Sequence, residues 1–309
     1  MAEFKHKPWL IVLTALMSLF ALIQYLFNAF AGQPSWSGGL FINTTGAVSD
    51  KFSLEITPAG ATFSIWGAIY AWQTAWLVYS LVLLGRKSST GYLYIDPGVI
   101  PLETILCYIA SEFVNVTWIF LWDRQIMAAA FPVLLLICLT LYAALFFAHR
   151  NLNRITPKLI ADNKKVDIWL VRLLVQNGIA FYATWCTIAT LLNLGIVISY
   201  TSDPPIDQSI ASTVSLSILT AEILFWFTLD IFFLDKYVRY NFSPYVVLVL
   251  ALTGVVSKNF VPGKRNAIFA VVLLALASVA FVVKFFTMFW RHFKRPFQSG
   301  NITKVSVEG

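Results

Sequence analysis

The feature that most constrains this chain is a series of uninterrupted apolar runs, several of which have the length of a membrane-crossing helix. The first, PWLIVLTALMSLFALIQYLFNAF, covers residues 8–30 without a charged side chain. A helix needs about 20 consecutive apolar residues to cross the hydrocarbon core of a bilayer. The chain has only 12% charged residues, against about 25% in a typical soluble domain. It is therefore predicted to be an all-α polytopic membrane protein that resides in the lipid bilayer.

Eight spans are predicted along the chain. The seventh contains only about a dozen apolar residues, so it fits a short span or a re-entrant segment equally well. The others are long enough to cross completely, and the fifth lies within a run that exceeds the length of one crossing. The predicted spans fall at 8–30, 63–84, 101–122, 126–148, 169–200, 214–234, 244–256 and 267–290.

Positive charges are distributed unevenly between the two sides of these spans. Of the 22 Lys and Arg residues, 15 fall on the side of the amino terminus, 5 fall on the other side, and Arg172 and Lys284 lie within spans. Cytoplasmic loops of membrane proteins are enriched in Lys and Arg, so both termini are predicted to be cytoplasmic. The net charge of +7 is then a consequence of topology, and no nucleic-acid partner is predicted.

Two features near the amino terminus bear on processing and location. Ala29-Phe30-Ala31 has the small-x-small pattern of a signal-cleavage site, and cleavage there would leave a receptor-like protein with seven spans. The apolar run at 8–30 is longer than the usual 7–15-residue signal core, which favours an uncleaved span. Asn43-Thr44-Thr45 is a glycosylation sequon in a loop predicted to be external. It favours the plasma membrane or an endomembrane over mitochondria.

Three of the predicted spans each carry a stripe of aromatic and amide side chains. Their residues recur every three or four positions, which places them on one face of a helix. A pocket for a lipophilic ring system needs this mixture of apolar walls and a few oriented polar groups. Trp72 and Trp76 lie on a different face of the second span and are expected to pack against neighbouring helices. The predicted ligand-binding residues are Phe63, Trp66, Tyr70 and Gln73 in the second span, Asn115 and Trp118 in the third, and Tyr182, Trp185, Ala189 and Asn193 in the fifth.

These elements resemble those of a known membrane family. ITPAGATFSIWGAIY resembles the start of the second helix in the tryptophan-rich sensory protein/translocator protein family (TspO/MBR, the peripheral benzodiazepine receptor group). SEFVNVTW resembles the N-x-x-W element of its third helix, and FYATWCTIATLLN resembles an element of its fifth helix. The resemblance implies a five-helix TspO-like bundle over about residues 1–200. Three additional transmembrane helices at 201–296 and a cytoplasmic tail at 297–309 are left unmatched.

The resemblance also implies a function. Family members bind tetrapyrroles, sterols or similar planar lipophiles and are often dimers, so a lipophilic small molecule and a homodimer are the expected partners. The expected function is binding of such a ligand, with its transport or sensing as open alternatives. Trp66 and Trp185 match the pocket tryptophans that the family links to porphyrin photochemistry. No enzymatic activity and no cofactor are predicted, because three departures from the family pattern argue against porphyrin breakdown. Ala59 and Phe181 stand where prolines are usual, and Ser111-Glu112 replaces a Gln-Leu pair.

Acidic residues within the spans support an alternative hypothesis. A charged acid at mid-bilayer costs roughly 2.5–3.5 kcal/mol on insertion scales, so such residues are functional candidates. Glu112, Glu222 and Asp230 would then serve a proton-coupled secondary transporter or a small-solute channel. Lys284, nearer a span end, is expected to reach the membrane interface. The three histidines are all at span ends, so neither a metal site nor a histidine-based catalytic triad is predicted.

Overall fold

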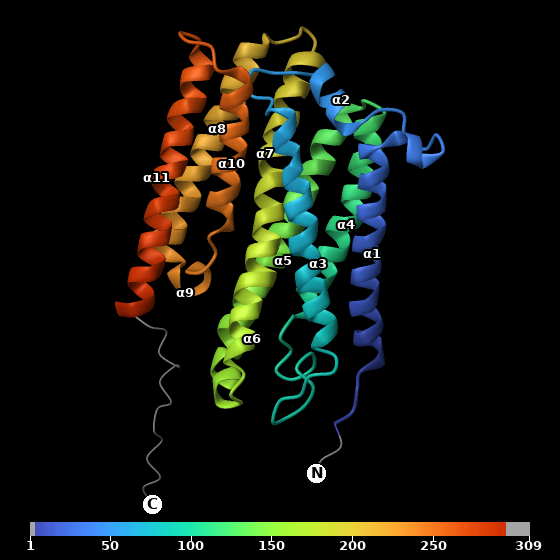
Figure 1. Ribbon diagram of the computed structural model, residues 1–309, viewed down its shortest axis with the longest axis vertical. Coiled ribbons are helices and arrows are strands. Elements are labelled where there is room, and N and C mark those ends of the chain that lie inside the picture. The colour runs from blue at the N-terminus through green and yellow to red at the C-terminus, as the bar shows by residue number, and fades with distance from the viewer. Residues whose placement is uncertain (1–3, 295–309) are drawn as a thin grey trace, which may run out of the picture.

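The computed structural model describes residues 4–294, which form a bundle of long helices (Figure 1). Shorter helical elements join them: α2 (Thr45–Lys51) and α9 (Asp235–Val238), 3-10 turns at Pro34–Ser37 and Gly60–Ser64, and π-helical segments at Val171–Gln176 and Leu229–Phe233. The predicted all-α polytopic class is confirmed. The long helices are α1 (Pro8–Gly32), α3 (Ile65–Val82), α4 (Leu102–Asp123), α5 (Met127–Ala161), α6 (Lys165–Leu170) continuing into α7 (Asn177–Tyr200), α8 (Gln208–Thr228), α10 (Ser243–Asn259) and α11 (Arg265–Lys294).

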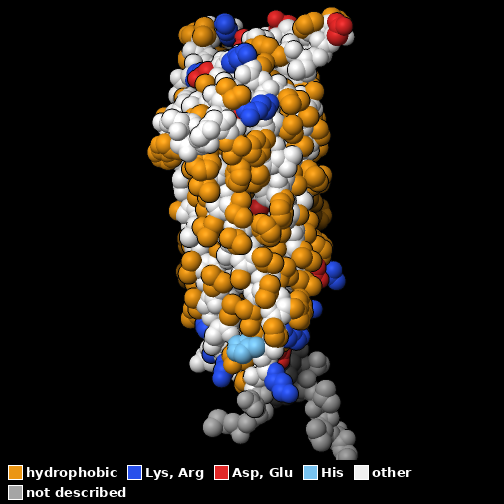
Figure 2. All heavy atoms as spheres, turned by 90° about the vertical axis from the view of Figure 1, so that its right-hand side faces the viewer, with side chains coloured by type: hydrophobic (Ala, Val, Ile, Leu, Met, Phe, Trp, Pro, Cys, Tyr) orange, Lys and Arg blue, Asp and Glu red, His pale blue; other side chains and the backbone are white. Residues whose placement is uncertain are grey.

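Six of the helical segments are long and apolar enough to cross a membrane. The two remaining long helices, α3 and α10, lie among them; their 18 and 17 residues give lengths of about 26 Å. The start of α1 and the end of α11 lie at one end of the bundle, here called the terminal end, and the opposite end is called the loop end (Figure 1). Figure 2 shows a face that is mainly hydrophobic between two ends carrying charged side chains. The predicted tail at 297–309 lies outside the described residues.

Helix α5 extends well beyond the predicted span at 126–148. Leu152, Ile155 and Leu159 recur every three or four residues and are buried, so the extension packs its apolar face against the rest of the bundle. Asn151 donates hydrogen bonds to the backbone oxygens of Gly98, at 2.8 Å, and Val99, at 3.1 Å. Beyond residue 148 the sequence is no longer uniformly apolar, and its amphipathic pattern continues α5 to Ala161.

Trp72 and Trp76 pack α3 against α7. A Cβ atom on Gly178 would lie 3.0 Å from Cδ1 of Trp72 and 3.4 Å from Cδ1 of Trp76, so glycine lets both indoles approach the α7 backbone. The Trp72 indole donates to the oxygen of Leu173 at 2.9 Å, and the Trp76 indole donates to Oε1 of Gln73 at 2.7 Å. Both tryptophans therefore hold two helices together.

The segment leading into α3, residues 54–64 and here called the lead-in segment, contacts the carboxyl-terminal helix α10. The backbone N–H of Ala59 donates to the oxygen of Gly254 at 3.0 Å, and Asn259 Nδ2 donates to the oxygen of Thr57 at 2.8 Å. A Cβ atom on Gly254 would lie only 2.1 Å from Oγ1 of Thr62. This close approach requires glycine and joins α10 to the amino-terminal helices at the loop end.

The first loop is fastened to the loop end of α4 by Asp123. Its Oδ1 accepts the backbone N–H groups of Ile42, at 2.9 Å, and Asn43, at 2.7 Å. The side-chain nitrogen of Asn43, the predicted glycosylation site, donates to the backbone oxygen of Asp123 at 2.9 Å. Attachment of a glycan to Asn43 would therefore replace a hydrogen bond that holds this loop.

Candidate functional site

Five of the predicted ligand-binding residues meet between α3 and α7. Trp66 stacks on Tyr70 with ring centres 5.6 Å apart. Its indole also meets the rings of Tyr182 and Trp185 edge-on, at 6.0 and 6.3 Å. Phe63 contacts Trp185 in the same way at 6.1 Å. These five side chains form a continuous group, here called the aromatic cluster.

The two predicted amides of α3 and α4 are engaged by the protein itself. Oδ1 of Asn115 accepts hydrogen bonds from the side chains of Gln24 and Asn28, each at 2.9 Å, and its Nδ2 donates to the hydroxyl of Tyr182 at 2.9 Å. Nε2 of Gln73 donates to the backbone oxygen of Gly178 at 2.8 Å. These bonds join α1, α4 and α7, and α3 to α7, so the amides contribute to helix packing.

The other three predicted residues lie outside the aromatic cluster. Trp118 stacks on Trp122 at 5.4 Å. Asn193 is buried, and its amide has no hydrogen-bond partner among the described residues. Ala189 lines a small cavity of about 60 Å³ together with Phe63 and Trp185. The other walls of this cavity come largely from α8 and α10, so the hollow beside the aromatic cluster faces the carboxyl-terminal helices.

Three larger cavities continue from this small one toward the terminal end. Their volumes are about 290, 460 and 270 Å³. Ile188 lines both the small cavity and the 290 Å³ cavity, Trp226 lines the 290 and 460 Å³ cavities, and Tyr237 lines the 460 and 270 Å³ cavities. The four cavities are therefore neighbours in a row, here called the seam, between α5 and α7 on one side and α8 to α10 on the other.

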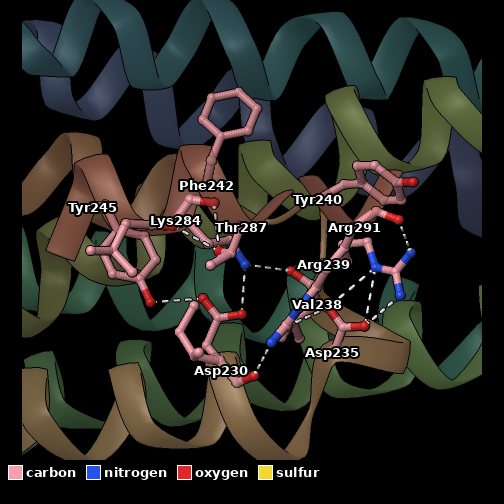
Figure 3. A network of polar contacts seen from close by, with 12 residues as sticks. Asp230, Asp235, Val238, Arg239, Tyr240, Phe242, Tyr245, Lys284, Thr287 and Arg291 are labelled. Atoms are coloured by element: carbon pink, nitrogen blue, oxygen red, sulfur yellow. Dashed lines mark hydrogen bonds and ion pairs between the residues drawn. The ribbon is translucent and has the colours of Figure 1, made fainter. Parts of the chain in front are cut away.

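Asp230 is not an isolated charge. Lys284 on α11 donates to its Oδ1 at 2.6 Å, and the hydroxyl of Tyr245 on α10 donates to its Oδ2 at 2.7 Å (Figure 3). Asp230 and Lys284 are 1% and 2% exposed, so the expectation that Lys284 reaches the membrane interface is wrong. Beside them, Arg291 donates to Asp235 at 2.8 Å. Carboxylate and ammonium compensate each other's desolvation at the junction of α8, α10 and α11.

The other two candidate acids have different surroundings. Glu112 is buried on α4, with its Oε1 3.5 Å from the hydroxyl of Ser111 and its Oε2 without a hydrogen-bond partner among the described residues. Glu222 lies on α8 and lines the 290 Å³ cavity of the seam. The three acids therefore occupy separate environments.

Sequence reasoning missed most polar residues of the seam, among them two whose side-chain groups have no hydrogen-bond partner in the described chain. Trp226 and Asn241 line the same 290 Å³ cavity as Glu222. Trp226 follows Glu222 by four residues, so both lie on one helical face, and this spacing could have indicated Trp226 as a site residue. Asn241 lies between α9 and α10, where no periodic pattern indicates the direction of its side chain.

The fold and these cavities define a polytopic α-helical membrane protein with hollow space between its helices. The sequence pattern of the TSPO-like protein family matches residues 9–286, so the chain belongs to that family. The match continues into α11 and thus includes the helices that the sequence motifs had left without a counterpart. No curated protein and no solved structure matches the chain.

Proposed function

We propose that the protein binds a lipophilic small molecule within the bilayer, in the seam, without chemical turnover. The observation that carries this proposal is the row of four neighbouring cavities beside the aromatic cluster. Small-molecule sites are typically hollows of about 300–1,000 Å³ with apolar and aromatic walls and a few polar groups. The middle cavities, of about 290 and 460 Å³, supply this volume.

A planar lipophile such as a tetrapyrrole or a sterol fits the chemistry of the walls. Phe63 and Trp185 belong both to the aromatic cluster and to the lining of the small cavity. Aromatic rings bury large apolar areas and favour stacked or edge-on contacts with flat molecules. A ligand lying along the seam would therefore contact the indole of Trp185 at one end.

Binding of protoporphyrin IX and of cholesterol to the purified protein in lipid nanodiscs tests the proposal. Ile188→Trp places a large ring where the first two cavities meet and is expected to weaken binding about tenfold, equivalent to about 1.4 kcal/mol. Trp36→Phe, which changes an indole that is 69% exposed at the loop end, serves as the control and should bind like the wild type. Equal binding by wild type and Ile188→Trp would contradict a site in the seam.

A further inference from the structure

Glu222 carries the one acidic group that lines the 290 Å³ cavity of the described chain, and no Lys or Arg lines that cavity. Glu222 is also exposed at the surface of the described chain, and the surface of a membrane-spanning helix at this position faces hydrocarbon. Within residues 4–294, Glu222 forms neither an ion pair nor a hydrogen bond; the groups that interact with it electrostatically are Tyr142 and Cys138 of α5. A carboxylate in a membrane-spanning helix needs a counter-charge or a proton, because hydrocarbon cannot solvate the anion.

Two further polar groups in the same cavity lack partners. The indole N–H of Trp226 and both polar atoms of the Asn241 side chain have no hydrogen-bond partner among the described residues. Asn241 is 1% exposed, so neither bulk water nor lipid headgroups reach it. Buried polar groups are almost always hydrogen-bonded, and leaving one unpaired costs about 1–3 kcal/mol. Glu222 and these two side chains thus line one largely apolar cavity.

We propose that this cavity binds a lipophilic amine, a molecule with an apolar body and one protonated nitrogen. This inference rests on the proposed function and names the ligand chemistry that the 290 Å³ cavity of the same seam would recognise, in addition to the planar lipophiles. The ammonium group pairs with the carboxylate of Glu222, and the rings of Tyr142 and Trp226, which line the cavity, offer aromatic faces to the cation. The amide of Asn241 accepts from the ammonium or bonds to a second polar group of the ligand.

The surrounding charges favour a cation over an anion at this position. Arg150 lines the neighbouring 460 Å³ cavity, and Lys236 lines the 270 Å³ cavity beyond it. An anionic lipid would place its headgroup beside those basic residues near the terminal end and would be repelled by Glu222. The cavity that contains Glu222 has no positive charge of its own, so the ligand must bring it.

A matched pair of photoactivatable probes tests the inference. Both carry the same diazirine-bearing alkyl chain; one ends in a dimethylamine, protonated at neutral pH, and the other in an uncharged N-methylacetamide. The full chain is reconstituted in liposomes and labelled, and the modified peptides are identified by mass spectrometry. We expect the amine probe to label the cavity-lining peptides of α5 and α8 at a half-saturating concentration about tenfold below that of the amide probe, a difference of about 1.4 kcal/mol.

The variant Glu222→Gln is expected to abolish the preference for the amine, and thermal unfolding close to that of the wild type shows that the variant is folded. Glu103→Gln changes another exposed acid, at the start of α4, and should keep the wild-type preference. Equal half-saturation by the two probes in the wild type, or a preference that survives Glu222→Gln, would overturn the lipophilic-amine assignment alone. Labelling of the cavity peptides by neither probe would overturn it together with the proposed function.

Discussion

Helix α8 and the π-helical segment Leu229–Phe233 that continues it form one span with two acids, and the two sides of this span that carry them differ in their surroundings. On the side that packs against α10 and α11, Asp230 receives an ammonium group at 2.6 Å and a tyrosine hydroxyl at 2.7 Å. On the side that faces α5 and α7, Glu222 lines a cavity of about 290 Å³ and has no partner in the described chain. The two acids are eight positions apart, Glu222 in α8 and Asp230 in the π-helical segment that follows it.

The contrast assigns a structural role to Asp230 and a ligand-binding role to Glu222. A buried carboxylate with a counter-ion and a satisfied hydrogen bond fixes the relative position of helices, and breaking such a pair is strongly destabilising. A carboxylate that faces a cavity contributes little to packing, and it remains free to pair with a charged group of a ligand. Stability should therefore depend on the Asp230 side of α8, and ligand binding on the Glu222 side.

The largest effect is expected for Lys284→Met. The substitution keeps an apolar side chain of similar length but leaves the carboxylate of Asp230, which is 1% exposed, without its counter-ion. Removing one partner of a buried ion pair typically costs about 3–5 kcal/mol. Thermal unfolding of the protein in nanodiscs should show a corresponding loss of stability.

The double variant Asp230→Asn/Lys284→Met is the control for this experiment. It removes both charges, and replacing a buried ion pair by uncharged groups is often close to neutral. The double variant should thus be more stable than Lys284→Met alone. If Lys284→Met unfolds like the wild type, the ion pair does not fix these helices, and the proposed contrast between the sides of α8 fails.

A smaller loss of stability is expected for Gly254→Ala, which tests the attachment of α10 to the lead-in segment. The new methyl group would lie 2.1 Å from Oγ1, 2.8 Å from Cγ2 and 2.9 Å from Cβ of Thr62. Overpacking of this kind typically costs about 1–3 kcal/mol. Adding Thr62→Ala removes the two closest groups, so the double variant should recover part of the stability in the same unfolding assay. If Gly254→Ala is as stable as the wild type, α10 and the lead-in segment can move apart without a loss of stability, and their contact does not hold the fold together.

The sequence predicted those parts of the fold and site that depend on local periodicity. Apolar runs located the spanning helices, and spacing of three or four residues correctly placed Trp66 and Tyr70 on one face of α3. The matching stripe on α7 placed Tyr182 and Trp185 opposite them, and the structure brings the two faces together.

Partners that are distant in the chain could not be predicted in this way. Lys284 is 54 residues from Asp230, and nothing in the local pattern distinguishes a lysine that reaches the interface from one that pairs within the bundle. Asn115 has the composition of a ligand contact, yet Gln24 and Asn28 occupy its oxygen. Which polar groups are satisfied by the protein, and which remain available, is decided by tertiary packing.

A modest effect is expected for Tyr182→Phe, which removes one hydrogen bond from the amide network between α4 and α7. The hydroxyl of Tyr182 accepts from Asn115 at 2.9 Å, and the two bonds that Asn115 accepts remain. Hydrogen bonds between membrane helices average about 0.6 kcal/mol, so unfolding should change by about that amount. Asn115→Leu leaves the donors of Gln24 and Asn28 unpaired and should be more damaging. An equal loss in both variants would show that the bond between Asn115 and Tyr182 accounts for the stability of the network and that the bonds from Gln24 and Asn28 add nothing.

The smallest effect on stability is expected for Glu222→Gln. The carboxylate contributes no ion pair or hydrogen bond within the described chain, and a neutral amide is less costly to hold in hydrocarbon than a charged acid. The variant should therefore unfold within about 0.5 kcal/mol of the wild type, as is usual for substitutions away from packed features, while losing its preference for the amine probe. A loss comparable to that of Lys284→Met would instead make Glu222 a structural residue. Both acids would then stabilise the fold, and no difference in role between Glu222 and Asp230 would remain.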